Sequence, residues 1–393
     1  MRLSWQCRSS IWQISRKSLK FRSIATGILS ILICIASEGA EADDAVQLRG
    51  SVDARSWETG QRMFYSDPYW RGGDCASSVD LGNGRVLWLF ADSYIGVEPP
   101  YVRDYCCVNM IRNCVGIQKG YDPSTADFNV YWRSTEENPS AYFPCDDTSW
   151  YWPGNAVKID SFLVVFLMHL CPSDAGLGFR ECEDYPHAAF LVSHIDHDPL
   201  EWAITRLLLP ESQFGIMLGA ATLIDLPYLY MFNVDVHDQR DASMSLCRWD
   251  IDSLLMGSVE AIEWWTGADS SWVPDPYLVS KPAAVFTEGA TELSVVFDET
   301  SDRFLAIQTI GFGAADVVMR TAPFLTGPWS PPQLVYEPAE KAVKDIKIYA
   351  AKVHPEIMGA DLVITYCANA PIETIIADTT IYYPRFVRLN WER

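Results

Sequence analysis

The sequence predicts an all-β protein, a five-bladed β-propeller of four-stranded antiparallel blades covering residues 56–393. Aromatic residues make up 13% of the 393-residue chain, a share more typical of β-rich folds than of helical bundles. Helical periodicity is nearly absent, and only residues 250–262 are ambiguous. An extended segment ending in tryptophan recurs in steps of 62 to 70 residues, the length of one blade. The five tryptophans are Trp132, Trp202, Trp264, Trp329 and Trp391.

Each repeat opens with two short apolar strands separated by turn residues. In the first repeat the turn contains Asn83-Gly84, the strongest short-range signal for a β-hairpin. No linker rich in Pro, Ser or Gly interrupts the series, which disfavours two separate domains. The predicted strand pairs are 76–79 with 85–90, 156–159 with 162–167, 220–224 with 228–232, 293–297 with 304–310, and 350–353 with 362–366.

The first 42 residues have the pattern of a signal peptide. Basic residues precede an apolar run at 24–36, whose 13 residues are too few to span a bilayer. Small residues at Ala40 and Ala42 predict cleavage before Asp43, which leaves a lead-in at 43–55. The protein is then secreted or periplasmic and has no membrane contact after cleavage. A short uncleaved membrane anchor is the alternative.

An exported chain uses its cysteines for disulfides before metal sites. Cys171 and Cys182 bracket a short loop and are the first predicted pair. Nine cysteines remain after cleavage, so at least one is free or intermolecular. The cluster Cys106, Cys107 and Cys114 lacks the paired Cys-x-x-Cys spacing of a zinc site, so we expect no structural metal there.

The charge balance argues against a nucleic-acid partner. The chain has 30 Lys and Arg against 51 Asp and Glu, a net charge of −21, and no basic patch. It also lacks a Gly-x-Ser-x-Gly elbow, a phosphate-binding loop and a dinucleotide fingerprint. We expect a carbohydrate as the partner.

The residues that open the innermost strands of a propeller converge at one end of the central channel. Blade five contributes Lys352 and His354 slightly further along its strand, and Arg71 and Asp92 accompany the first hairpin. The residues that open the other four strands are Asp74, Asn155, Gly219 and Glu292.

The register of the first hairpin decides whether two of these acids meet. A three-residue loop at 82–84 would place Asp74 directly opposite Asp92, with their Cβ atoms about 5 Å apart. The two carboxyls would then repel, and the ionised form of one would be disfavoured unless Arg71 or Arg103 compensates. A two-residue Asn-Gly loop would put them on opposite faces, and Asp92 as a strand cap is a further alternative.

Two acids from different blades suit glycoside hydrolysis. One carboxyl protonates the leaving oxygen while the other activates water or attacks carbon. Asp74 and Glu292 are the predicted pair, with Asp92 in support. Four aromatic residues next to these segments either stack on sugar rings or pack between blades. They are Trp70, Trp150, Tyr151 and Trp152.

Two groups of histidines are candidate ligands. Residues 194–198 contain two histidines and two aspartates, but they lie just before an outer strand, which favours a solvated turn. His354 faces inward and is either a core residue or the neighbour of a channel ion, and this ion is the one cofactor we consider.

Several segments taken together resemble a family of secreted bacterial proteins known as domain of unknown function 4185 (DUF4185). The match runs in order over about 330 residues, from near Tyr69 to the end. That family is similar to the five-bladed furanosidase propellers of glycoside hydrolase family 43, and some relatives are endo-acting D-arabinanases. The segments are Gly72-Gly73-Asp74, 89–93, Tyr151-Trp152-Pro153-Gly154-Asn155, 291–296, Gly327-Pro328-Trp329, Val353-His354-Pro355-Glu356 and 382–386.

The resemblance implies roles for three carboxyls. Asp74 matches a general base, Glu292 matches a glutamate that could act as general acid, and Asp92 matches a second channel aspartate. The family usually has aspartate where this chain has Asn155, and an amide cannot lend negative charge to a neighbouring acid. The expected substrate-binding residues are Asn155, Trp152, Arg71, His354, Trp70 and Tyr151.

The sequence therefore predicts a secreted hydrolase that cleaves furanose-containing, arabinan-type polysaccharide. An inverting mechanism requires the carboxyls about 6.5–9.5 Å apart, and a retaining one about 5 Å. The alternative function is a non-catalytic carbohydrate-binding or surface-interaction propeller, which Asn155 favours.

Overall fold

We describe the protein from a computed structural model. The predicted signal peptide, its cleavage site, Arg103, Cys106 and Cys107 lie outside the described residues. Among the described helices, none is long and apolar enough to cross a membrane. The described residues are 52–96, 108–135, 138–146, 148–174, 178–183, 185–211, 214–235, 242–267, 271–311, 313–358 and 362–391.

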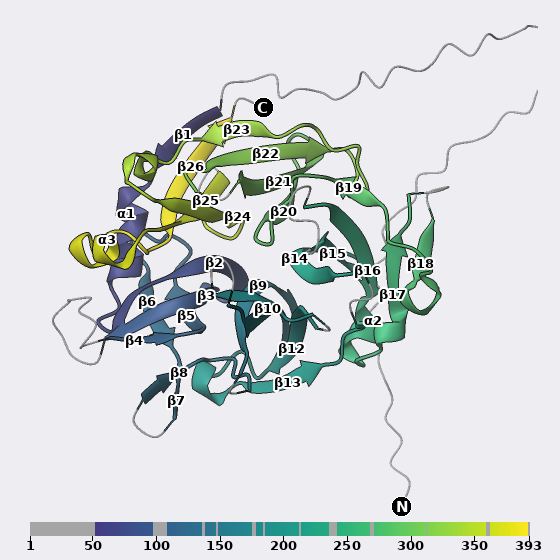
Figure 1. Cartoon of the computed structure of the whole chain (residues 1–393), viewed down its shortest axis with the longest axis horizontal. Coiled ribbons are helices and arrows are strands. Elements are labelled where there is room, and N and C mark those ends of the chain that lie inside the picture. Colours follow the sequence, from purple (N-terminus) through teal and green to yellow (C-terminus); the bar gives the residue numbers. More distant parts are fainter. Residues whose placement is uncertain are drawn as a thin grey trace, which may run out of the picture. The chain divides into compact units, whose positions relative to one another are not determined.

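Five antiparallel sheets surround a central axis, as the sequence predicts (Figure 1). In each sheet the first strand of the blade lies innermost. Blade one contains β2 (Trp70–Gly82), β3 (Arg85–Gly96), β5 (Cys114–Lys119) and β6 (Asp127–Tyr131), with β4 (Val108–Ile111) paired to β3. Blade two contains β9 (Trp150–Ile159), β10 (Phe162–Pro172), β12 (His187–Ser193) and β13 (Ala203–Leu207), with β11 (Phe179–Glu181) paired to β10.

The remaining three blades repeat this plan. Blade three contains β14 (Ile216–Asp225), β15 (Tyr228–Asp235), β16 (Met244–Asp250), β17 (Ile262–Trp265) and β18 (Trp272–Pro274), with β19 (Ala284–Phe286) paired to β16. Blade four contains β20 (Ser294–Asp298), β21 (Arg303–Ile310), β22 (Asp316–Ala322) and β23 (Gln333–Tyr336). Blade five contains β24 (Lys347–Val353), β25 (Leu362–Asn369), β26 (Arg385–Trp391) and β1 (Val52–Ser56).

Elements outside the blades are short. The ambiguous segment 250–262 forms one helical turn, a 3-10 turn and the start of β17. The hairpin of β7 (Arg133–Thr135) and β8 (Asn138–Ser140) lies beside blade one. The α-helices are α1 (Glu58–Gln61), α2 (Ile251–Leu255) and α3 (Ile372–Ala377), and the 3-10 helices are η1 (Arg62–Tyr65), η2 (Pro199–Glu201), η3 (Val259–Ala261), η5 (Asp275–Tyr277) and η6 (Ala339–Ala342).

The first described strand closes the ring. β1 pairs antiparallel with β26, from Val52 opposite Trp391 to Ser56 opposite Val387, and is the outer strand of blade five (Figure 1). Residues 52–55, which we placed in a lead-in, therefore belong to the propeller. The tryptophan repeat has the right period, but its members are not equivalent. Trp264 lies in the fourth strand of its blade, whereas Trp391 lies in the third because β1 takes the outer position.

The turn of the first hairpin combines the two predicted alternatives. Gly82 pairs with Arg85, so the loop is the two-residue Asn83-Gly84, and both residues have positive φ, as such a tight turn requires. A bulge just before Gly82 then shifts the register, so that Asp80 pairs with Val86. From Asp80 back to Ser77 the first inner strand therefore has the register that we expected only from a three-residue loop.

Further bulges lie where the inner strands approach the end of the channel. Between the pairs Gly73–Ser93 and Cys75–Phe90, Asp74 alone faces both Ala91 and Asp92. Register shifts also occur in β9, β14 and β24. In β14 the shift includes Gly219, whose φ is positive and where a Cβ atom would lie 2.5 Å from Phe166. A bulge changes the direction in which the following side chains point. Residues of one inner strand on either side of its bulge therefore face different mouths of the channel.

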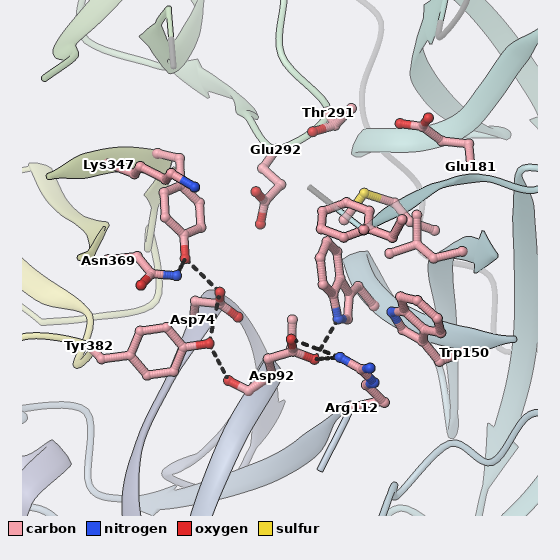
Figure 2. A pocket seen from close by; sticks show the side chains of 17 residues that line it. Asp74, Asp92, Arg112, Trp150, Glu181, Thr291, Glu292, Lys347, Asn369 and Tyr382 are labelled. Atoms are coloured by element: carbon pink, nitrogen blue, oxygen red, sulfur yellow. Dashed lines mark hydrogen bonds and ion pairs between the residues drawn. The ribbon is translucent and has the colours of Figure 1, made fainter. Parts of the chain in front are cut away.

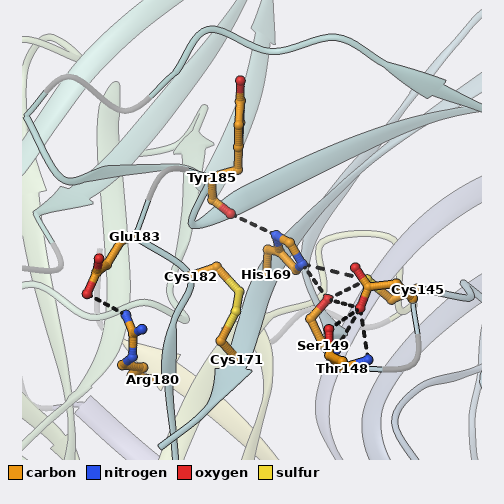
Figure 3. The surroundings of a disulfide bond; sticks show 10 residues. Cys145, Thr148, Ser149, His169, Cys171, Arg180, Cys182, Glu183 and Tyr185 are labelled. Atoms are coloured by element: carbon orange, nitrogen blue, oxygen red, sulfur yellow. Dashed lines mark hydrogen bonds and ion pairs between the residues drawn. A yellow bond between two sulfur atoms is a disulfide. The ribbon is translucent and has the colours of Figure 1, made fainter.

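The predicted disulfide between Cys171 and Cys182 is present, with Cα atoms 5.2 Å apart (Figure 3). It joins the end of β10 to the residue after β11, and so braces the segment that carries Phe179. Among the described residues, the cysteines outside this bond are Cys75, Cys114, Cys145, Cys247 and Cys367.

Replacing both disulfide cysteines by serine is expected to lower the free energy of unfolding by about 2–3 kcal/mol, because the bond closes a short loop. Denaturant unfolding of the double variant measures this loss. Cys145→Ser is the matched control, because Cys145 is free and only partly buried. An equal loss in the control would show that the effect comes from losing a thiol group rather than the bond.

Candidate active site

Four carboxyl side chains line a cavity of about 440 Å³ at one mouth of the channel, and three of them, Asp74, Asp92 and Glu292, are the predicted acids (Figure 2). Asp74 comes from β2 and Asp92 from β3, whereas Glu292 lies just before β20. Residues from blades one, two, four and five line this cavity. The inner strands thus bring together acids that are far apart in the sequence.

Asp74 accepts hydrogen bonds from two tyrosines through one carboxylate oxygen. The Tyr349 hydroxyl donates to Oδ2 over 2.6 Å and the Tyr382 hydroxyl over 3.3 Å. The other oxygen, Oδ1, is buried and has no hydrogen-bond partner among the described residues. Burial, followed by the charge of Asp92, raises the pKa of Asp74 well above its usual range, although the tyrosines and their hydrogen bonds oppose this shift.

Asp92 is held by an arginine and a tryptophan. The Trp152 indole donates to Oδ1 over 2.8 Å, and Arg112 Nη1 lies 3.2 Å from Oδ2. Burial raises the pKa of Asp92, and Arg112 is the main opposing influence. The Arg112 guanidinium also lies 4.2 Å from the centre of the Trp150 ring, so it links the acid to the aromatic wall of the cavity.

Glu292 interacts with a buried lysine and a thiol. Burial raises its pKa, while the charge of Lys352 and a hydrogen bond from Cys75 lower it. Lys352 is only 1% exposed, and its Nζ donates to the Gly154 carbonyl over 2.6 Å. The lysine is therefore a buried cation that favours the ionised form of Glu292.

Tyr349→Phe is expected to raise the pKa of Asp74 further, because it removes a hydrogen bond that stabilises the carboxylate. A hydrogen bond to a charged group is worth about 1.5–3 kcal/mol. Carbon-13 NMR titration of the aspartate carboxyls measures the change. Tyr383→Phe is the control, because the Tyr383 hydroxyl donates to the Trp70 carbonyl outside the cavity. An unchanged Asp74 titration in Tyr349→Phe would contradict the hydrogen bond.

Comparison with family models shows which family the chain belongs to. The model described as "Domain of unknown function (DUF5005)" matches residues 60–391. The chain belongs to the DUF5005 family. Our expectation of DUF4185 was wrong, because it depended on short segments that are each weak signals. A search of curated proteins finds no match.

Solved structures are similar to this DUF5005 protein to different degrees. A Bacteroides ovatus ATCC 8483 protein, provisionally named a hydrolase, has a TM-score of 0.63 at 15% identity, over 86% of this chain and 90% of that one. An α-L-arabinofuranosidase from Lactobacillus brevis has a TM-score of 0.46 at 11% identity, and the match covers 83% of the DUF5005 chain and 93% of the arabinofuranosidase. A xylan β-1,4-xylosidase from Bacillus halodurans C-125 has a TM-score of 0.45 at 10% identity, and the match covers 83% of the DUF5005 chain and 54% of the xylosidase.

Of the six expected substrate-binding residues in the DUF5005 chain, Trp152 lines the cavity. Trp70 and Tyr151 do not, because they belong to the core between blades: Trp70 is 0% exposed and packs on Phe90, and Tyr151 packs on Phe190. Successive side chains of a strand point to opposite faces, so Tyr151 points away from the face that Trp152 shares with Trp150.

The three other expected binding residues lie away from the carboxyls. Arg71 is buried at 4% exposure and does not line the cavity. Asn155 lies beyond the bulge in β9 and lines a cavity at the other channel mouth, where its Oδ1 accepts a hydrogen bond from Thr222. His354 is fully buried between blades, so it cannot touch a substrate in the carboxyl cavity.

The surroundings of His354 leave no ring nitrogen free for an ion. Nδ1 is hydrogen-bonded to the Ser78 hydroxyl and Nε2 to the Thr365 hydroxyl. Burial lowers the pKa of His354 to about 3, so the ring is neutral. No group of three or more His, Cys, Asp and Glu side chains suited to a metal occurs in the described part of the chain. At residues 194–198 the structure has the expected turn, with His197 60% exposed.

The structure adds cavity residues that we did not predict. Tyr349 had a usable signal, because it lies near the start of an inner strand as Asp74 does. Tyr382 follows α3 outside any inner strand, so although 382–386 is one of the segments of the family resemblance, the propeller geometry gave no reason to place it at the channel. Other unpredicted lining residues are Arg112, Phe179, Glu181, Thr291, Lys347 and Asn369.

Proposed function

We propose that this DUF5005 protein is a glycoside hydrolase whose carboxyl pair is Asp74 and Glu292. The observation that carries the proposal is the meeting of three acids with raised pKa values in one cavity beside aromatic side chains. Titratable groups with perturbed pKa values in a cavity are typical of catalytic sites. Aromatic rings such as Trp150 and Trp152 supply apolar faces for sugar rings.

In this proposal Asp74 is the general base and Glu292 the general acid. Asp74 Oδ1 lacks a hydrogen-bond partner among the described residues and can accept a proton from water, while the tyrosines hold Oδ2. The water oxygen bonds to the anomeric carbon as the glycosidic C–O bond breaks, and Glu292 gives its proton to the leaving oxygen. Asp92, fixed by Arg112 and Trp152, is a negative charge beside Asp74. We expect inversion, with the carboxyls about 6.5–9.5 Å apart.

The proposed base has a definite pH dependence. Asp74 must be ionised to accept a proton, and its pKa is raised. Activity is therefore lost on acidification at a higher pH than for an ordinary aspartate, and Tyr349→Phe moves this loss to higher pH still.

We propose furanose-containing, arabinan-type polysaccharide as the substrate, and the panel of polysaccharides below tests this choice. A site of action outside the cytoplasm is supported by the Cys171–Cys182 disulfide, since such bonds persist in oxidising compartments. A purely carbohydrate-binding protein was favoured by Asn155 only if this residue faced the acids. Asn155 lies at the other channel mouth and therefore does not favour it.

A reducing-sugar assay on arabinan, arabinogalactan, xylan and galactan tests the proposal. We expect release by the wild type and a loss of about 10²–10⁴-fold in both Asp74→Asn and Glu292→Gln. Thr222→Val, at the other channel mouth, is the control that keeps activity. Release that survives both carboxyl substitutions would remove the site assignment, and binding without release would identify a carbohydrate-binding protein.

A further inference from the structure

A second cavity of about 440 Å³ adjoins the carboxyl cavity. The two cavities share Thr291, Glu292 and Tyr349 as lining residues. Asp74 and Asp92 line only the first cavity. Glu292 therefore lies where the two cavities meet, and the other two carboxyls lie to one side of it.

The two cavities offer different surfaces to a ligand. The carboxyl cavity has an aromatic wall of Trp150, Trp152 and Phe179, in which Phe179 packs edge-on against Trp152 with ring centres 4.7 Å apart. The second cavity is lined by the end of β21, at Thr309 and Ile310, and by residues 288–290 before β20. Tyr349 is the aromatic side chain among its described lining residues.

We propose that the second cavity binds the leaving group of the substrate. This inference rests on the proposed function, because it takes Glu292 as the general acid. The acid must reach the glycosidic oxygen, and the attacking water beside Asp74 must approach the anomeric carbon from the face opposite that oxygen. The sugar that is attacked then lies in the carboxyl cavity, and the departing chain lies beyond Glu292.

The size and polarity of the second cavity indicate what the leaving group is. Its volume lies within the range of about 300–1,000 Å³ that holds small-molecule ligands, and far exceeds the needs of a single hydroxyl. Hydroxyl, backbone and carboxylate groups at Thr309, Gly311 and Glu288 suit a sugar, and the near absence of aromatic surface favours release. The substrate is therefore an oligosaccharide or polysaccharide that continues beyond the cleaved bond.

The inference can be tested by filling the second cavity. Ile310→Trp places a large ring there, 18 positions along the chain from Glu292. We compare kcat/KM on a linear oligosaccharide with that on an aryl glycoside of the same sugar, whose leaving group is small. The expected result is a loss at least about tenfold larger on the oligosaccharide, equivalent to about 1.4 kcal/mol of leaving-group binding. Leu334→Trp, 55% exposed on the outer strand β23, is the control and changes neither rate.

Each outcome has a distinct meaning. Equal losses on both substrates, or no loss on the oligosaccharide, overturn the leaving-group assignment and leave the proposed hydrolase in place. Absence of wild-type activity on both substrates overturns the proposed function and the inference with it. If Ile310→Trp does not fold, as judged by thermal melting, Ala290→Trp fills the same cavity from a loop and is judged by the same ratio.

Discussion

Glu292→Gln is expected to lose about 10²–10⁴-fold in kcat/KM on a natural glycoside but to keep most of its activity on an aryl glycoside with an acidic phenol as leaving group. A good leaving group departs without a proton, so it does not need the general acid. Asp74→Asn is expected to lose activity on both substrates, because the water still needs a base. Steady-state kinetics of the two variants on matched substrates measure the difference.

The losses of activity in the two variants show which carboxyl is the general acid and which is the general base. If Asp74→Asn is the variant rescued by the activated substrate, the two carboxyls have exchanged roles. This outcome would fit the raised pKa of Asp74, which has two carboxyl neighbours and no ion-pair partner among the described residues. Added azide discriminates further, because a small anion replaces a missing base and not a missing acid. The stereochemistry of the azide product reports which face of the sugar is attacked.

Lys352→Met is expected to destabilise the fold by about 3–5 kcal/mol at pH 8, because it leaves the buried Glu292 without its neighbouring cation. Losing Lys352 raises the pKa of Glu292 further. The unfolded state has the same glutamate pKa in both proteins, so the loss of stability grows as pH rises above the already raised pKa of Glu292 in the folded wild type. Below that pKa Glu292 is protonated in both folded proteins, and the loss shrinks. Urea unfolding at pH 5 and pH 8 measures this dependence.

A double-mutant cycle separates the charge from the packing. Glu292→Gln removes the acid charge, and the Lys352→Met substitution in that background should cost much less than in the wild type. Equal costs in the two backgrounds would mean that Lys352 acts through its hydrogen bond to the Gly154 carbonyl and not through Glu292.

The hairpins of the inner strands are predictable from sequence because they depend on local turn chemistry and on apolar runs. The position of Asp74 beside Asp92 is harder to predict, because it depends on a two-residue turn, a bulge before Gly82 and further register shifts on both sides of Cys75. A period-2 reading of Trp150-Tyr151-Trp152 already separates Tyr151 from its neighbours. The position of Asn155 at the other channel mouth could be predicted only with knowledge of the bulge in β9, and that bulge has no sequence signal of comparable strength.

Residues brought in by tertiary contact were the least predictable. Arg112 reaches Asp92 from the segment between β4 and β5, and Tyr382 reaches Asp74 across 308 residues of chain. Neither residue lies at the start of an inner strand, which is the position that the propeller geometry predicts for channel residues. The interaction of the buried Lys352 with Glu292 was likewise not predictable, because the two residues come from different blades.

The pairing of β1 with β26 has a consequence for how the protein assembles and fails. This single ladder joins residue 52 to residue 391, so almost the whole chain is one loop whose ends meet there. Every other blade is built from strands close together in the sequence and can form while synthesis proceeds. The last blade has three strands, β24, β25 and β26, until β1 pairs with β26. The same joint is the natural place for partial opening, since parting two strands leaves the sheets of the other four blades intact.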